Sequence, residues 1–289
     1  MKALLRRFAV RALRAGIGLT GETGRRLTAE AMAVGPESLL EIVERVPTKR
    51  GDIDFYCLGD LALWRARTLL TKEPETIEWI EGIIDGDVFW DVGANVGLYS
   101  IYAAITRKVK VLAFEPAAGN YMLINRNIEI NGLSDFVQAY CVALANKTGI
   151  DALHMQSTEL GGAMSSFAEA KDHEGRPFVP IFKQGAIGYS IDEYIKVFNP
   201  AFPNHLKVDV DGIEDQIITG AFNTLRDPRL RRISIELEAN RVEYTNAIVR
   251  DIEAAGFVLK ARRHSELFEG GDFAYVYNYH FERSTGRQS

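Results

Sequence analysis

The chain has 289 residues, of which 47% are hydrophobic and 25% charged, and its formal net charge is −5. This is the composition of an ordinary soluble globular protein with its own core, and it excludes a disordered or collagen-like chain. The negative charge argues against a general nucleic-acid binder, which needs clustered Lys and Arg. The only two cysteines, Cys57 and Cys141, lie too far apart for a disulfide framework or a cysteine-based zinc site, which favours a reducing, cytoplasmic compartment.

The N-terminal segment is basic and amphipathic. Residues 1–33 hold seven basic residues against two acidic ones, and apolar residues recur there at steps of three and four. This periodicity predicts a helix, and residues 1–46 as a whole are predicted to be helical. Such a segment can lie on an anionic membrane surface, serve as an organellar transit peptide, or pack on its own domain or on a second subunit. We expect the extension to cover residues 1–50 and to end in the polar break at 47–54.

Residues 51–283 are predicted to form one domain, followed by a flexible tail over 284–289. The stretch 55–70 is rich in aromatic and aliphatic residues and is expected to form strands or a hairpin. A helix is expected to follow from Glu73 to about residue 83, with acidic residues in its first turn.

From residue 88 onward, short apolar runs alternate with helical stretches. This alternation predicts an α/β fold with a doubly wound parallel sheet and helices on both faces. The predicted strands are 88–92, 109–114, 136–142, 206–210, 233–237, 258–261 and 273–277, and the predicted helices are 98–106, 121–131 and 247–255. Residues 146–190 break the pattern with glycines and no long helical period, so we expect them to form an insertion that covers the sheet and shapes a substrate pocket.

The first predicted strand, 88–92, runs into the glycine-containing turn 93–97. Glycines there let the backbone turn sharply and approach a ligand. A dinucleotide fingerprint would have glycine at the positions of Asn95 and Leu98, so the sequence argues against a dehydrogenase and suits a ligand without phosphates. Asp91, at the end of the strand, would repel pyrophosphate and attract an ammonium group.

The second predicted strand ends at Glu115, 24 positions after Asp91. An acidic residue there is placed to accept hydrogen bonds from ribose hydroxyls. Taken singly, Asp91 could be a helix cap and Glu115 a surface residue. Together at this spacing they predict a pocket for a nucleoside that carries an amino acid.

The segment DVGANVG at 91–97, followed by FEP at 114–116, resembles the class I S-adenosylmethionine-dependent methyltransferases and, more narrowly, the FkbM family. The resemblance covers about residues 72–238 and departs conservatively at Asp211, where Glu is more usual. It extends to KEPET at 72–76, Asn127 and Asn131, GAMSS at 162–166, SID at 190–192 and KVDVDGIE at 207–214.

This resemblance implies a class I, Rossmann-like O-methyltransferase that moves the methyl group of S-adenosylmethionine onto a hydroxyl of a saccharide, glycolipid, polyketide or other small metabolite. Ser165, Ser166 and His154 are expected near the substrate. The implied cofactor contacts are Asp91, Gly93, Ala94, Asn95 and Gly97 at the methionine end, Glu115 on the ribose, Pro116 beside the adenosine, and Val142 and Ala143 beside the adenine.

The fourth predicted strand of this fold would end beside the methyl donor. Alternation along the segment that begins at Leu206 places Lys207, Asp209 and Asp211 on one side of the strand. Asp209 and Asp211 are therefore the leading catalytic candidates, with Glu236 as a third. A carboxylate there can act as a general base, whereas three together can hold Mg²⁺. Alternatively, Asp209 and Lys207 merely pair within the sheet.

The expected partner is a small-molecule or glycan acceptor, and no nucleic acid. We also expect the N-terminal helix to contact a membrane surface peripherally or to join two copies of the chain. A rival hypothesis from another class is a non-catalytic module that keeps the fold and binds a partner through residues 1–46.

Overall fold

The computed structural model describes residues 22, 42–265, 269, 271 and 273–284. The chain divides into one unit of residues 1–42 and a second of residues 43–289. Almost all of the predicted basic helix, and the tail beyond residue 284, lie outside the described residues. Within the described part, no helix has both the length and the hydropathy that crossing a membrane requires.

Two predictions near the start of the second unit are wrong. Residues 42–46 are not helical but form β1 (Ile42–Val46), which pairs with β2 (Ile53–Cys57). The Nε of Arg45 on β1 binds Oδ1 of Asp54 on β2 at 2.7 Å. The segment is rich in β-branched residues, which suit a strand once a partner strand is available.

The expected strands or hairpin over 55–70 extend only as far as the end of β2. They are followed by α3 (Asp60–Thr68), which buries Ala62, Leu63 and Ala66. These residues have the three- and four-residue spacing of a helix face, and a reading by composition alone overlooks that period.

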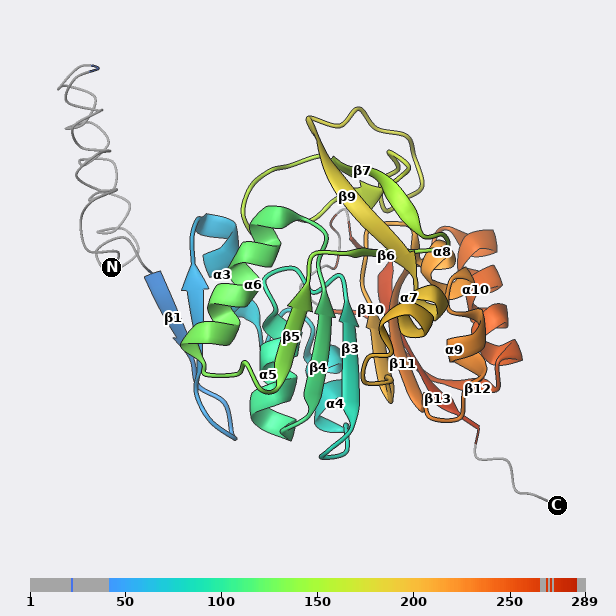
Figure 1. Cartoon of the computed structure of the whole chain (residues 1–289), viewed down its shortest axis with the longest axis horizontal. Coiled ribbons are helices and arrows are strands. Elements are labelled where there is room, and N and C mark those ends of the chain that lie inside the picture. Colours follow the sequence, from blue (N-terminus) through green and yellow to red (C-terminus); the bar gives the residue numbers. More distant parts are fainter. Residues whose placement is uncertain (1–21, 23–41, 266–268, 270, 272, 285–289) are drawn as a thin grey trace. The chain divides into compact units, whose positions relative to one another are not determined.

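The central sheet has seven strands in the order β12-β13-β11-β10-β3-β4-β5 (Figure 1). Neighbours from β11 to β5 are parallel, as predicted, but β13 is antiparallel to both β11 and β12. A parallel neighbour needs a crossover, whereas β13 follows β12 without an intervening helix among the described residues. The strands are β3 (Val88–Val92), β4 (Lys110–Phe114), β5 (Val137–Tyr140), β10 (His205–Val208), β11 (Arg232–Glu238), β12 (Phe257–Arg263) and β13 (Val276–Arg283).

Helices cover both faces of this sheet, as the alternating pattern predicted. Adjacent residues of a strand pack into cores on opposite faces of the sheet. Phe89 packs in the core with α4, α5 and α6, and Trp90 packs in the core with α7, α8, α9 and α10. This alternation follows from the two-residue period of a strand. The helices are α4 (Pro74–Glu81), α5 (Leu98–Arg107), α6 (Ala118–Ile130), α7 (Ile191–Phe198), α8 (Glu214–Thr219), α9 (Phe222–Arg226) and α10 (Val242–Ala254).

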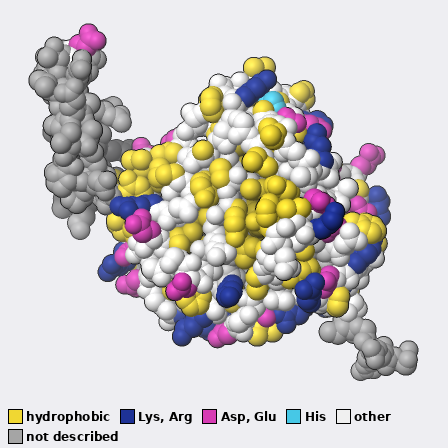
Figure 2. Space-filling model, viewed as in Figure 1, with side chains coloured by type: hydrophobic (Ala, Val, Ile, Leu, Met, Phe, Trp, Pro, Cys, Tyr) yellow, Lys and Arg dark blue, Asp and Glu magenta, His cyan; other side chains and the backbone are white. Residues whose placement is uncertain are grey.

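Residues 143–190 form a second sheet, of four strands in the order β6-β9-β7-β8. Figure 1 shows this sheet at the carboxyl ends of the central strands. In the same view, Figure 2 shows apolar side chains at the surface around β9 and α7, where Ile187, Val197 and Phe198 are about half exposed. The strands are β6 (Ala143–Ala145), β7 (Gly149–Met155), β8 (Ser165–Phe167) and β9 (Phe182–Ser190).

Candidate active site

A cavity of about 440 Å³ lies at the carboxyl ends of β3, β4, β10 and β11. Its lining combines α3, the turn after β3, the loop after β10, and residues of the segment 160–165, which leads into β8 and which we call the strap. The predicted residues that line it are Gly93, Ala94, Asn95, Glu115, Pro116, Ser165, Asp209, Asp211 and Glu236.

The turn after β3 is shaped by close approach of the protein's own backbone. Gly93 has φ +81°, and a Cβ there would lie 1.9 Å from the backbone oxygen of Asp209. Gly97 has φ +84°, and its Cβ would lie 2.5 Å from Cγ1 of Ile124. Gly97 is not among the described lining residues of the cavity, and its lack of a side chain lets α5 and α6 pack.

Glu115 sits on the cavity wall at the end of β4 and is only 6% exposed. Its Oε2 accepts a hydrogen bond from the backbone N–H of Asn95, and its Oε1 from that of Ala117, both at 2.8 Å. Burial raises the pKa of Glu115 to about 7, although these two backbone bonds act in the opposite direction. Its carboxyl therefore fixes the turn after β3, and the residue still lines the cavity.

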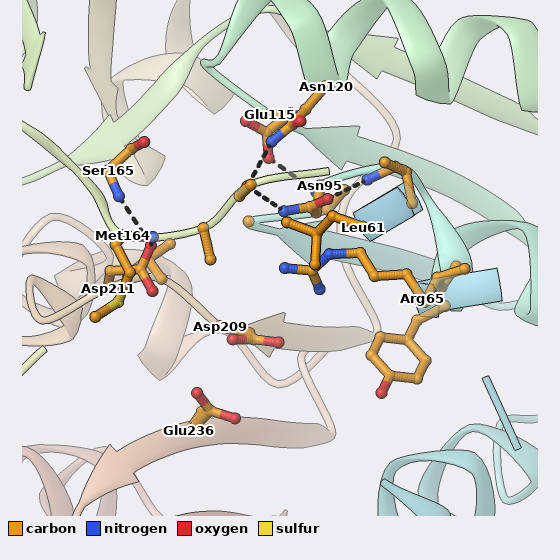
Figure 3. A pocket seen from close by; sticks show the side chains of 18 of the residues that line it. Leu61, Arg65, Asn95, Glu115, Asn120, Met164, Ser165, Asp209, Asp211 and Glu236 are labelled. Atoms are coloured by element: carbon orange, nitrogen blue, oxygen red, sulfur yellow. Dashed lines mark hydrogen bonds between the residues drawn. The ribbon is translucent and has the colours of Figure 1, made fainter. Parts of the chain in front are cut away.

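The strap is fastened across the cavity at both ends (Figure 3). At one end, Nδ2 of Asn95 and Nδ2 of Asn120 donate to the oxygen of Gly162 at 2.8 and 2.9 Å. At the other end, Oδ2 of Asp211 accepts from the backbone N–H groups of Met164 and Ser165 at 2.5 and 3.0 Å. Asp211 thus uses its carboxylate to hold the strap.

Two predicted substrate contacts lie away from this cavity. Ser166 follows Ser165 on β8, and strand alternation turns it into the interior, where it is fully buried. His154 is paired with Ser166 across the insertion sheet and is not among the described lining residues. Of the three substrate candidates, the structure places Ser165 alone at the cavity.

The floor of the cavity is a cluster of carboxylates and lysines. Carboxylate oxygens of Glu73, Asp209 and Glu236 lie within 4.8 Å of one another. Lys207 Nζ is 2.5 Å from Oδ2 of Asp209, and Lys72 Nζ is 2.5 Å from Oε1 of Glu73. Two of the three clustered carboxylates, Asp209 and Glu73, therefore have an ammonium partner, and Glu73 takes the place that the Mg²⁺ alternative gave to Asp211.

The carboxyl groups of this cluster have pKa values shifted in opposite directions. Burial acts to raise the pKa of Asp209, but the ammonium groups of Lys207 and Lys72 outweigh it and hold the pKa below its usual value. Burial and the carboxylates of Asp209 and Glu73 raise the pKa of Glu236 well above its usual value. The lysines thus favour the ionised form of Asp209, while burial and the neighbouring carboxylates disfavour ionisation of Glu236 and raise its pKa.

Strand alternation is not what brings Asp209 and Asp211 to the cavity. β10 ends at Val208, two residues before the predicted end, and the chain then turns through Gly212 with φ +95°. Asp209 therefore meets Lys207 at the floor, while Asp211 reaches the strap. The predicted pairing of Asp209 with Lys207 is present, yet it leaves Asp209 a quarter exposed at the cavity.

Three further cofactor candidates lie beside the cavity rather than on it. Asp91 is 1% exposed and accepts a hydrogen bond from the hydroxyl of Ser100 at 2.6 Å, so it is buried beneath the predicted methionine end. Val142 and Ala143 line a smaller adjoining cavity together with Pro116.

The sequence reasoning missed one wall of the cavity. Leu61, Trp64 and Arg65 project from α3 at helical spacing, a signal that was present in the stretch read as strands. The other lining residues not predicted are Lys72, Val96, Leu98, Tyr99, Asn120, Gly162, Ala163, Met164, Val210, Phe273 and Val276.

Comparisons with known proteins identify the family of this chain. The sequence model of the Methyltransferase FkbM domain matches residues 91–259. The chain is 26% identical to the Hexuronic acid methyltransferase AglP of Haloferax volcanii over 211 residues, which cover 72% of this chain and 80% of that protein. It is also 26% identical to Methyltransferase 1 of Beauveria bassiana, over 62% of this chain and 75% of the relative. A solved putative rRNA methylase from Clostridium thermocellum aligns with a TM-score of 0.46 at 10% identity, over 75% of this chain and 98% of its own.

Proposed function

This chain belongs to the FkbM methyltransferase family, and we propose that it is an S-adenosylmethionine-dependent O-methyltransferase acting on a hydroxyl of a saccharide or glycolipid. One observation carries the proposal: the carboxylate of Asp209, whose pKa two lysines hold down, lies beside Glu236 in the cavity that the turn after β3 and Glu115 also line. Chemistry at an oxygen nucleophile needs a proton acceptor at this place.

The chain's own residues fit the donor. Glu115 follows β4 and lines the cavity, where ribose hydroxyls can donate to its carboxyl group. Pro116, Val142 and Ala143 offer an apolar side for the adenine. The charged carboxylate of Asp209, a quarter exposed at the cavity, favours the positive charge of a sulfonium group.

S-adenosylmethionine supplies a methyl group already activated on a sulfonium sulfur. Asp209 accepts a hydrogen bond from the acceptor hydroxyl and takes its proton as the new C–O bond forms and the C–S bond breaks. The hydroxyl becomes strongly acidic only as that bond forms, so a carboxylate of low pKa suffices as base. Much of the rate acceleration then comes from holding the oxygen in line with the methyl group.

Two observations support a saccharide acceptor over a polyketide or another small metabolite. The relative from Haloferax volcanii is named for a hexuronic acid. Trp64 and Phe273, with 39% and 38% of their surfaces exposed, line the same cavity, and aromatic faces of this kind pack against the C–H faces of sugars.

The decisive experiment has a binding arm and a transfer arm. Calorimetry with S-adenosylhomocysteine tests the donor site, and a deuterated methyl donor offered with neutral saccharides, acidic saccharides and polyketides tests the acceptor. A labelled methyl ether that survives mild alkali supports the proposal. A labelled ester would place the chemistry on a carboxyl group, label on polyketides alone would favour the small-metabolite alternative, and no donor binding would contradict the assigned activity and favour a non-catalytic module.

A further inference from the structure

Arg65 carries a guanidinium group from α3 into the cavity, where it lies between Asn95 and Asp209 (Figure 3). Its Nε donates to the backbone oxygen of Gly161 at 2.6 Å, which fixes the direction of the side chain. Among the described residues, none accepts a hydrogen bond from its two terminal amino groups. A partly buried fork held in this way presents two parallel donors to an anion.

The other cations at the cavity floor are already engaged. Lys72 is paired with Glu73 and Lys207 with Asp209, each at 2.5 Å. The remaining charged groups on the cavity wall are carboxylates, which suit the positive groups of a donor. Arg65 is therefore the group with donors to offer to a negative charge.

We propose that Arg65 binds the α-carboxylate of the methionyl part of the methyl donor, an inference that rests on the proposed function. The donor would place its ribose at Glu115 and its methyl group at Asp209, and Arg65 projects into the cavity between these two carboxylates (Figure 3). The amino-acid part carries one carboxylate, whose two oxygens can each accept a hydrogen bond from one N–H group along an edge of the guanidinium.

A carboxylate could also come from an acidic saccharide acceptor. Arg65 lies beside Asn95, which belongs to the turn after β3. The methionine end of the donor is expected at that turn, so this position favours the donor's carboxylate over that of an acceptor. Both sources share one chemistry, so the test must vary the two carboxylates separately.

The test measures the affinities of S-adenosylmethionine and of decarboxylated S-adenosylmethionine for the full-length protein and its variants. We expect the unmodified protein to prefer the carboxylated donor by about 10- to 100-fold, as for a charged hydrogen-bonded pair. Arg65→Gln should reduce this preference to less than about threefold, and Arg65→Lys should retain part of it. Arg67→Gln is the matched control: Arg67 lies on the same helix but pairs with Glu44, and the preference should not change.

The ratio of two affinities measured on one protein does not depend on how much of a variant is folded. Equal weakening of both donors in Arg65→Gln would mean that the arginine only anchors the strap through Gly161, and would overturn the inference. An unchanged ratio with a raised KM for acidic saccharides, but not neutral ones, would assign Arg65 to the acceptor and overturn it too. Failure of the unmodified protein to bind either donor would instead contradict the proposed function itself.

Discussion

The cavity contains two kinds of carboxylate, distinguished by what each one binds. At the floor, Asp209 and Glu73 bind lysine ammonium groups at 2.5 Å. Elsewhere on the cavity lining, Glu115 binds backbone N–H groups of the turn after β3 and of Ala117, and Asp211 binds those of the strap. Glu115, Asp209 and Asp211 follow the ends of β4 and β10, whereas Glu73 is the N-cap of α4, so position at a strand end does not separate the two kinds.

Their protonation does separate them. Burial raises the pKa of Glu115 and of Asp211, and the backbone amides do not fully offset it. Lysine outweighs burial at Asp209 and holds its pKa down. A full positive charge at close range stabilises a carboxylate more than partial charges do. Lysine-bound carboxylates therefore stay charged and available for chemistry, whereas amide-bound ones hold loops in place.

The largest expected effect lies at the floor. Asp209→Asn keeps the shape and removes the charge, so turnover should fall roughly 10²–10⁴-fold with donor affinity changed far less. Turnover and calorimetry with S-adenosylhomocysteine check this. Recovery of the variant at raised Mg²⁺, with loss of the unmodified enzyme's activity in a chelator, would indicate a metal ligand; normal turnover would remove Asp209 as the base.

The next effect concerns the pH dependence of the free energy of unfolding, to which Glu214, an amide-bound carboxylate outside the cavity lining, contributes. Glu214, 4% exposed, accepts from the backbone N–H of Gly212 and the hydroxyl of Tyr244, and burial raises its pKa to about 7. Its neutral form favours folding below about pH 4.5, and this contribution is lost as the pH rises to about 7. Glu214→Gln should remove up to about 3 kcal/mol of that pH dependence.

Urea unfolding at pH 5 and pH 8 measures this change. The exposed Glu243→Gln on α10 is the control and should leave the pH dependence unaltered. An equal pH dependence in Glu214→Gln and in the unmodified chain would show that amide-bound carboxylates here do not behave as one class.

A smaller effect is expected at the donor end of the cavity. Glu115→Ala should weaken S-adenosylhomocysteine binding by about 1–3 kcal/mol, because hydrogen bonds to a charged or strongly polar carboxyl are lost. Calorimetry measures the loss, and Glu115→Gln keeps an oxygen for the turn after β3. Unchanged affinity in both variants would show that Glu115 does not bind the donor and only holds the turn after β3 in place.

The smallest effect should follow from loosening the strap. Asp211→Asn keeps one oxygen for the amides of Met164 and Ser165, so we expect a loss of about 1 kcal/mol, seen as faster hydrogen exchange of these two amides and an acceptor KM about fivefold higher. Turnover should fall much less than in Asp209→Asn. Equal losses of turnover in the two variants would contradict the division between floor and strap.

Local sequence patterns determined much of this protein. The turn after β3, Glu115 and the segment around Asp209 are contiguous motifs at the ends of apolar runs, and parallel strands bring such ends to one edge whatever the loops do. The same periodicity predicted helices on both faces of the sheet. These features depend on neighbours within a few residues, which a sequence displays directly.

Only the tertiary structure decided which carboxylate does what. Glu73 meets Asp209 and Glu236 across more than a hundred positions of sequence, and Lys72 arrives with it. More than a hundred sequence positions also separate Arg65 from Asp209. Pairings of this kind depend on how α3, α4 and the insertion pack against the sheet, and the pKa of each carboxyl follows from its partner rather than from its place in a motif.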